Sequence, residues 1–251
     1  MKRSILRALV VLSAGYWSAS AATAIAQEKT ARATPVPAQV TIPAAKGWKQ
    51  LTATDTRTVW QGRPGNSYHV RVVAGKCDVP MDDSDRLRQH VRAKAKEWKG
   101  GMIEAKFMKI NDRPCAFYIV KNTKPRLNGY RYLGRCIIPF EGGYHEIGMD
   151  TLPVGPTGRR EAFLAVKLNL YGNVVMEEIP EEAPPTPGPG GQGKRRVKGL
   201  FRDPYDRKFD AVGNYWVTDD AKYDKQFPMH SLSRLRSEFP KVLKTIQVPQ
   251  K

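Results

Sequence analysis

The chain has 251 residues, 41% of them hydrophobic, and a formal net charge of +18. This hydrophobic content excludes a fully disordered chain, and no apolar run reaches the roughly 20 residues of a membrane-spanning helix. The positive charge favours contact with anionic partners.

The first 26 residues have the layout of a secretory signal peptide. Lys2, Arg3 and Arg7 flank the start of the short apolar run 8–12, and small residues follow as far as Ala26. We expect cleavage near Ala26, with Ala21 as the second candidate, and a periplasmic or secreted protein. In that compartment the expected anionic partner is a lipid headgroup, a wall polymer or an acidic protein rather than nucleic acid. The alternative is that the basic surface only keeps the protein soluble.

Residues 27–45 lack a hydrophobic period and predict a flexible leader. An antiparallel α+β domain is expected over residues 46–176. Alternation over residues 68–73 predicts a strand. The acidic run 82–85 can cap a helix whose apolar stripe recurs at helical spacing from Leu87 to Trp98. Four basic side chains of this helix are candidate contacts for a polyanion: Arg86, Arg88, Arg92 and Lys96.

A period of two from Met102 to Asp150 predicts four strands. Turn residues at 112–114, 124–125, 128–129 and 141–143 separate the strands by connections that are too short for parallel pairing. These residues therefore predict an antiparallel meander.

A second helix is expected to start at Thr157 and to bury Ala162, Phe163, Val166 and Leu170. Residues 177–199 are rich in proline and glycine and end in a basic run, so they predict a disordered loop or linker. That run supplies further candidate polyanion contacts: Lys194, Arg195, Arg196 and Lys198.

The C-terminal segment, residues 200–251, is too short for a core of its own and should pack back on the domain. Ser231 can cap its helix, whose face carries Leu232, Leu235 and Phe239. Pro240 predicts a kink or a break in this helix.

This order of elements resembles the PsbP-like α/β sandwich. The residues that carry the resemblance are the helix 87–98, the run 144–147 and the helix start 157–162, and residues 223–234 are similar to a tail segment of uncharacterised exported bacterial proteins. The resemblance implies a curved antiparallel sheet of about five to six strands with helices packed on it. Such an architecture implies a binding or assembly role rather than catalysis.

The three cysteines are Cys77, Cys115 and Cys136. A turn centred between Pro125 and Arg126 would place Cys115 opposite Cys136, where an exported protein can form a disulfide. A turn centred on residues 128–129 would separate them. The alternative is that all three are buried free thiols.

The residues form no recognisable catalytic, cofactor or metal motif, because the four histidines are far apart and His145 lies in a strand pattern. The leading hypothesis is an exported, non-enzymatic binding or assembly protein whose basic surface meets an anionic partner of the cell envelope. One alternative is an envelope hydrolase or thiol enzyme that uses Cys115, Cys136 or His145. The other is a scaffold domain of an envelope complex.

Overall fold

The computed structural model describes residues 47–123, 129–169, 176–178, 195–197, 203–206 and 217–248. All of them belong to one compact unit, residues 36–251. The predicted signal peptide and the predicted leader, residues 27–45, lie outside the described residues, so both stay predictions, as does cleavage near Ala26. No described helix is long and apolar enough to cross a membrane.

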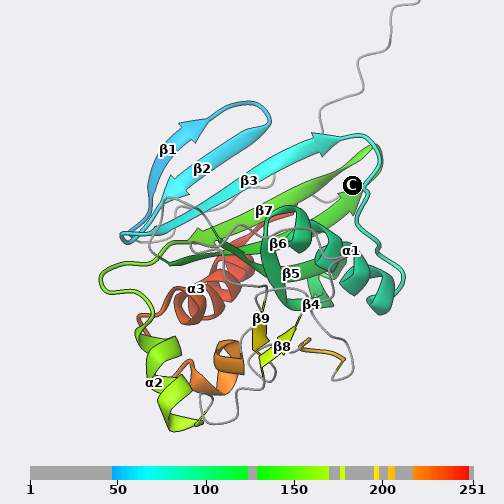
Figure 1. Ribbon diagram of the computed structural model, residues 1–251. Helices are drawn as coiled ribbons and strands as arrows, with labels where there is room; N and C mark the ends of the chain where they lie inside the picture. The colour runs from blue at the N-terminus through cyan, green and yellow to red at the C-terminus, as the bar shows by residue number, and fades with distance from the viewer. Residues whose placement is uncertain are drawn as a thin grey trace, which may run out of the picture. The chain divides into compact units, whose positions relative to one another are not determined.

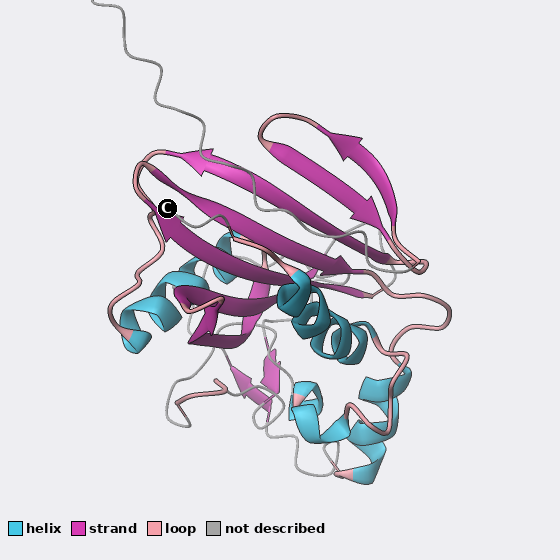
Figure 2. Cartoon of the chain, turned by 180° about the vertical axis from the view of Figure 1, so that it is seen from behind, coloured by secondary structure: helices cyan, strands magenta, loops and turns pink. Residues whose placement is uncertain are grey.

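The fold is α+β, as predicted, and is built on one antiparallel sheet (Figures 1 and 2). Its order is β1-β2-β3-β7-β6-β5-β4. The strands are β1 (Lys49–Ala53), β2 (Arg57–Gln61), β3 (Asn66–Ala74), β4 (Gly100–Ile110), β5 (Arg113–Thr123), β6 (Tyr130–Phe140) and β7 (Gly143–Thr151). The sheet thus has seven strands, and the expected count of five to six was too low.

The predicted meander is confirmed as β4–β7, and its hairpins explain the register. Asn111 and Asp112 both have positive φ, which is the geometry of the two-residue turn that joins twisted antiparallel strands. After β3 the chain crosses through α1 to β4 at the far edge, and the meander then returns until β7 pairs with β3. This return places β2, β3, β7 and β6 side by side.

The helices α1 (Ser84–Glu97) and α3 (Ser231–Thr245) lie on opposite faces of the sheet (Figure 1). The carboxylate of Asp83 accepts from the backbone N–H groups of Asp85 and Arg86 and begins α1, as the acidic run predicts. Helix α1 packs on β4, β5 and part of β6, whereas α3 packs on β6 and β7. On the face of the sheet that carries α1, the part formed by β2, β3 and β7 therefore has no covering helix among the described residues.

The C-terminal helix approaches the sheet closely at Gly134. A Cβ atom at this position would lie 2.6 Å from Cδ1 of Phe239, so only glycine admits that ring. Pro240 lies inside α3, and the helix continues to Thr245, so the prediction of a break there is wrong. His230, not Ser231, is the N-cap residue of α3.

The predicted stripe of the second helix is also wrong. In α2 (Arg159–Lys167) the side chains of Phe163 and Val166 are 50% and 73% exposed, and Leu164 is buried instead. The inward face is taken by Arg160, whose guanidinium donates to the backbone carbonyls of Thr218 and Asp220 and to side chains of the C-terminal segment. Only one face of α2 can be buried, and the hydrogen bonds of Arg160 favour the face that carries Arg160 and Leu164. The predicted Leu170 lies outside the described residues.

Short elements complete the described part of the chain. They are β8 (Met176–Glu178), β9 (Arg195–Val197), and the 3-10 turns η1 (Val217–Asp219) and η2 (Ala221–Tyr223). β8 and β9 pair with each other, and both fall at or within the predicted linker 177–199, whose other residues lie outside the described ranges.

Candidate functional site

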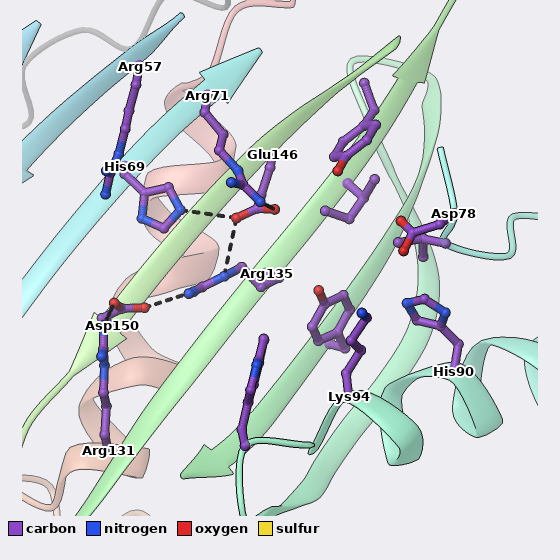
Figure 3. A pocket seen from close by; sticks show the side chains of 15 residues that line it. Arg57, His69, Arg71, Asp78, His90, Lys94, Arg131, Arg135, Glu146 and Asp150 are labelled. Carbon is purple, nitrogen blue, oxygen red and sulfur yellow. Dashed lines mark hydrogen bonds and ion pairs between the residues drawn. The ribbon is translucent and has the colours of Figure 1, made fainter. Parts of the chain in front are cut away.

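A pocket of about 480 Å³ lies where α1 stops covering the sheet (Figure 3). Its lining comes from β2, β3, β5, β6, β7, α1 and the segment before α1. In β3 and β7 the residues of one parity, such as Val70 and Ile147, join the core beneath α3. Residues of the other parity, such as His69 and Glu146, therefore point toward the pocket.

Glu146 is the centre of the pocket floor. One carboxylate oxygen lies 3.2 Å from His69 Nε2 and 3.4 Å from Arg135 Nε, and the other accepts a 2.6 Å hydrogen bond from Arg71. Burial alone would raise the pKa of Glu146, but the hydrogen bond from His69 and the positive charges of Arg135 and Arg71 outweigh it and lower the pKa to about 2. Glu146 is therefore ionised and fully engaged at neutral pH.

A second carboxylate, Asp150, continues the network along β7. It accepts a 2.8 Å hydrogen bond from Arg135 Nη1 and another from Arg131 Nη2. Burial raises the pKa of Asp150, and the charges of Arg135 and Arg131 lower it further than burial raises it. Arg135, which is only 9% exposed, is thus fixed between two carboxylates.

Gly148 makes room for this network. It pairs with His69 on β3 and with Arg135 on β6, so the three residues form one cross-strand row. A Cβ atom on Gly148 would lie 2.5 Å from His69 Nε2 and 3.0 Å from Arg135 Nη1. The missing side chain therefore lets the imidazole and the guanidinium lie over β7.

The next row carries more positive than negative charge. Arg57, Arg71 and Glu146 are successive partners across β2, β3 and β7; we call them the arginine row. Arg57 and Arg71 are direct cross-strand partners of like charge. Glu146 bonds Arg71, while the Arg57 side chain has no ion-pair partner among the described residues. The arginine row can therefore accept an anion.

The other end of the pocket is formed by α1 and the segment before it. Asp78, His90, Lys94, Trp98 and Tyr118 lie there; we call them the helix end (Figure 3 labels the first three). Burial lowers the pKa of His90, although Asp78 opposes this, so the imidazole is largely neutral at pH 7. Burial raises the pKa of Tyr118, so its hydroxyl stays protonated.

The lining as a whole is cationic. It holds five lysine or arginine side chains against three carboxylates, which leaves two positive charges in excess before the histidines are counted. The pKa of the central carboxylate, Glu146, is about 2, so this group is ionised at neutral pH and cannot act as a general acid there. No cluster of metal-ligating side chains occurs among the described residues. This arrangement suits the binding of an anion.

The predicted polyanion contacts on α1 lie outside this pocket. Arg86 pairs with Asp82 at 2.6 Å, Arg88 with Asp85 at 2.7 Å, and Arg92 makes two 2.8 Å hydrogen bonds with Asp203. Lys96 is exposed. Lys194 and Lys198 lie outside the described residues, and the side chains of Arg195 and Arg196 in β9 are not described. Their role stays a prediction, but three of the four helix residues already have carboxylate partners.

The two cysteines of the predicted disulfide lie beneath α3, on the face opposite the pocket. Phe117 pairs with Cys136, so Cys115 is a diagonal neighbour of Cys136 and not its direct partner. All three thiols are free, and Cys115 is hydrogen-bonded to Cys136 and to the carbonyl of Met108. The disulfide stays a prediction.

His145 gives no support to a thiol enzyme. It is 2% exposed, and its ring packs against Phe140 at 4.7 Å. Burial lowers its pKa to about 4, and its Nδ1 has no hydrogen-bond partner among the described residues. A base that activates a thiol must be hydrogen-bonded to it, whereas the thiols of the described residues contact the carbonyls of Val79 and Met108 and each other.

Sequence reasoning missed the pocket residues. The available signal was the opposite parity of the same strands, since Glu146 and Asp150 alternate with the apolar Ile147 and Met149. A charged outer face usually means solvent contact, and only the pairing of β3 with β7 shows that these charges meet.

No family model and no curated protein matches the chain. Among solved structures it is similar to the Ran-binding protein Mog1p of Saccharomyces cerevisiae, with 14% identity over 51% of this chain and 78% of that chain, and a TM-score of 0.35. LpqN of Mycobacterium tuberculosis, described as involved in cell envelope biogenesis, has 13% identity over 52% and 77% of the two chains and a TM-score of 0.29.

The PsbP protein of Synechocystis has 10% identity over 53% of this chain and 90% of its own, with a TM-score of 0.26. The predicted PsbP-like resemblance is confirmed to the extent that a PsbP protein is among the matches. All three TM-scores are below 0.5, so the proteins' roles carry no argument for this chain.

Proposed function

We propose that this chain is an exported binding protein whose pocket takes a ligand with a phosphate or carboxylate group. The observation that carries the proposal is the arginine row, in which Arg57 and Arg71 are cross-strand partners and only Arg71 is paired with a carboxylate. An anion beside Arg57 would give its guanidinium a partner and form charge-assisted hydrogen bonds. Export rests on the predicted signal peptide.

The floor supports binding rather than reaction. Glu146 and Asp150 hold Arg71, Arg135 and Arg131 in place, so the donors are oriented before a ligand arrives. A pocket of about 480 Å³ is within the range for one small ligand. We therefore place the anionic partner that composition predicts in this pocket, and not on the basic face of α1.

The histidines provide the test. The chain has four, of which His69 and His90 line the pocket, whereas His145 and His230 do not. Inorganic phosphate added at pH 7 should shift the imidazole proton NMR resonances of His69 and His90 saturably and leave the other two in place. Chloride at the same ionic strength is the control for screening.

A matched pair of arginine variants separates the pocket from the general basic surface. Arg57→Gln should weaken phosphate binding about threefold to fivefold, the effect of one exposed charge pair. Arg86→Gln removes the same charge from α1 outside the pocket and should leave the affinity unchanged. If phosphate shifts neither pocket histidine, or if Arg86→Gln weakens binding as much as Arg57→Gln, the proposal is wrong.

A further inference from the structure

The two ends of the pocket differ in chemistry, and this difference restricts the ligand. The arginine row offers guanidinium donors for an anion. The helix end offers a carboxylate acceptor in Asp78, an ammonium donor in Lys94, and a hydroxyl and an imidazole that can each donate and accept, in Tyr118 and His90. Among the lining residues of this end, Asp78 and Lys94 carry opposite signs, and Lys94 also pairs with Glu97 at 3.6 Å.

Groups that both donate and accept match ligand hydroxyls better than they match a second anion. The Tyr118 hydroxyl and the Asp78 carboxylate have no hydrogen-bond partner among the described residues. An anion at this end would meet Asp78, and an ammonium group would meet Lys94. A neutral polyol can bond to both without either repulsion.

The same region carries two partly buried aromatic rings, Trp98 and Tyr144, that line the pocket. Tyr144 lies two residues before Glu146 on β7, and its phenol interacts electrostatically with Arg71, Glu146 and Asp78. Such rings present an apolar surface beside polar groups. A pyranose has this character too, with C–H faces and a rim of hydroxyls.

We infer that the ligand is an anionic sugar, with its phosphate or carboxylate on the arginine row and its ring hydroxyls at the helix end. This inference rests on the proposed anion-binding function and names the ligand class. A purely aliphatic anion would be the weaker ligand, because such a chain offers no hydrogen-bond partner to the Asp78 carboxylate or the Tyr118 hydroxyl.

The inference is tested by calorimetry on the chain without its predicted signal peptide. The binding affinities of four compounds are compared: inorganic phosphate, hexyl phosphate, glucose 6-phosphate and glucose. Glucose 6-phosphate should bind about tenfold more tightly than inorganic phosphate, which corresponds to two net hydrogen bonds. Hexyl phosphate should bind no more tightly than inorganic phosphate, and glucose alone should bind more weakly than its phosphate. Glucuronate in place of glucose 6-phosphate shows whether the preferred anionic group is a carboxylate.

Lys94 and Lys96 supply matched variants, because they are two residues apart on α1 and lie on different faces of the helix. Lys94 lines the pocket, whereas Lys96 does not. Lys94→Met should remove most of the advantage of glucose 6-phosphate over inorganic phosphate, and Lys96→Met should leave that ratio unchanged. The ratio is the readout, because a variant that only disturbed folding would weaken both probes together.

The outcomes separate the two proposals. If inorganic phosphate binds and glucose 6-phosphate binds no more tightly, the sugar inference is overturned while anion binding stands. Equal gains for hexyl phosphate and glucose 6-phosphate, or a ratio that Lys94→Met leaves intact, would also overturn it. If none of the phosphates binds, the anion-binding function itself is wrong.

Discussion

The charge on Glu146 should stabilise the fold in a way that depends on pH. Its pKa is about 2 in the folded protein, against a usual value of 4.5, and its side chain is 9% exposed. A difference of this size corresponds to about 3 kcal/mol of folding free energy when the group is ionised. Glu146→Gln, which keeps the shape and removes the charge, should therefore lower the free energy of unfolding by about 3 kcal/mol at pH 7.

The sign of the pH dependence follows from the lowered pKa. The stabilisation is fully present above the unfolded-state pKa near 4.5 and is lost as pH falls toward the folded-state pKa near 2. Urea unfolding of the wild type and the variant at pH 7, 4.5 and 3 measures this. The difference between the two proteins should stay near its full size at pH 4.5 and fall to about half at pH 3.

The difference isolates one group, because the other titrating side chains are common to both proteins. Glu97→Gln, on the exposed side of α1, is the matched control and should change stability by less than about 0.5 kcal/mol. An effect of Glu146→Gln below about 1 kcal/mol at pH 7, or one that does not change with pH, would refute the reasoning about the pocket floor.

Two further substitutions probe packing around and behind the pocket. Gly148→Ala should destabilise the fold by about 1–3 kcal/mol in urea unfolding, because the added Cβ displaces His69 and Arg135, and wild-type stability would contradict the described row. Lys121→Met should cost about 3–5 kcal/mol, since it removes the ammonium group that lies 3.0 Å from the fully buried Asp219 carboxylate. Lys96→Met is the exposed control for the latter, and equal losses in both variants would refute the account.

Local patterns were enough to predict the meander and α1. Alternation places Ile147 and Met149 on one face, and a run of aspartates supplies the cap of α1. These features depend on residues that are close in sequence, so the pattern and the structure agree. Strands β1 and β2 were missed because their exposed residues show weak alternation, as the five exposed residues of β1 illustrate.

Errors arose where distant residues decide the outcome. The outward position of Phe163 follows from the hydrogen bonds that Arg160 makes with residues 218–233, more than 50 positions away. The pocket has the same origin. Arg71 and Glu146 are 75 positions apart, and they meet only because the meander returns to pair β7 with β3. Composition predicted an anionic partner and candidate contacts on α1 and in the run 194–198, and the pocket was not among them.

The position of the excess charge is the reason to look for the partner in the pocket and not on the helix. On α1, Arg86 and Arg88 are exposed or partly exposed and already paired, so a polyanion would have to compete with local carboxylates. In the pocket, Glu146 and Asp150 are likewise paired, but the cations outnumber them. Buried carboxylates orient the guanidiniums without cancelling their charge. A ligand anion at Arg57 would therefore add a partner that the described residues do not provide, next to the Arg71–Glu146 pair.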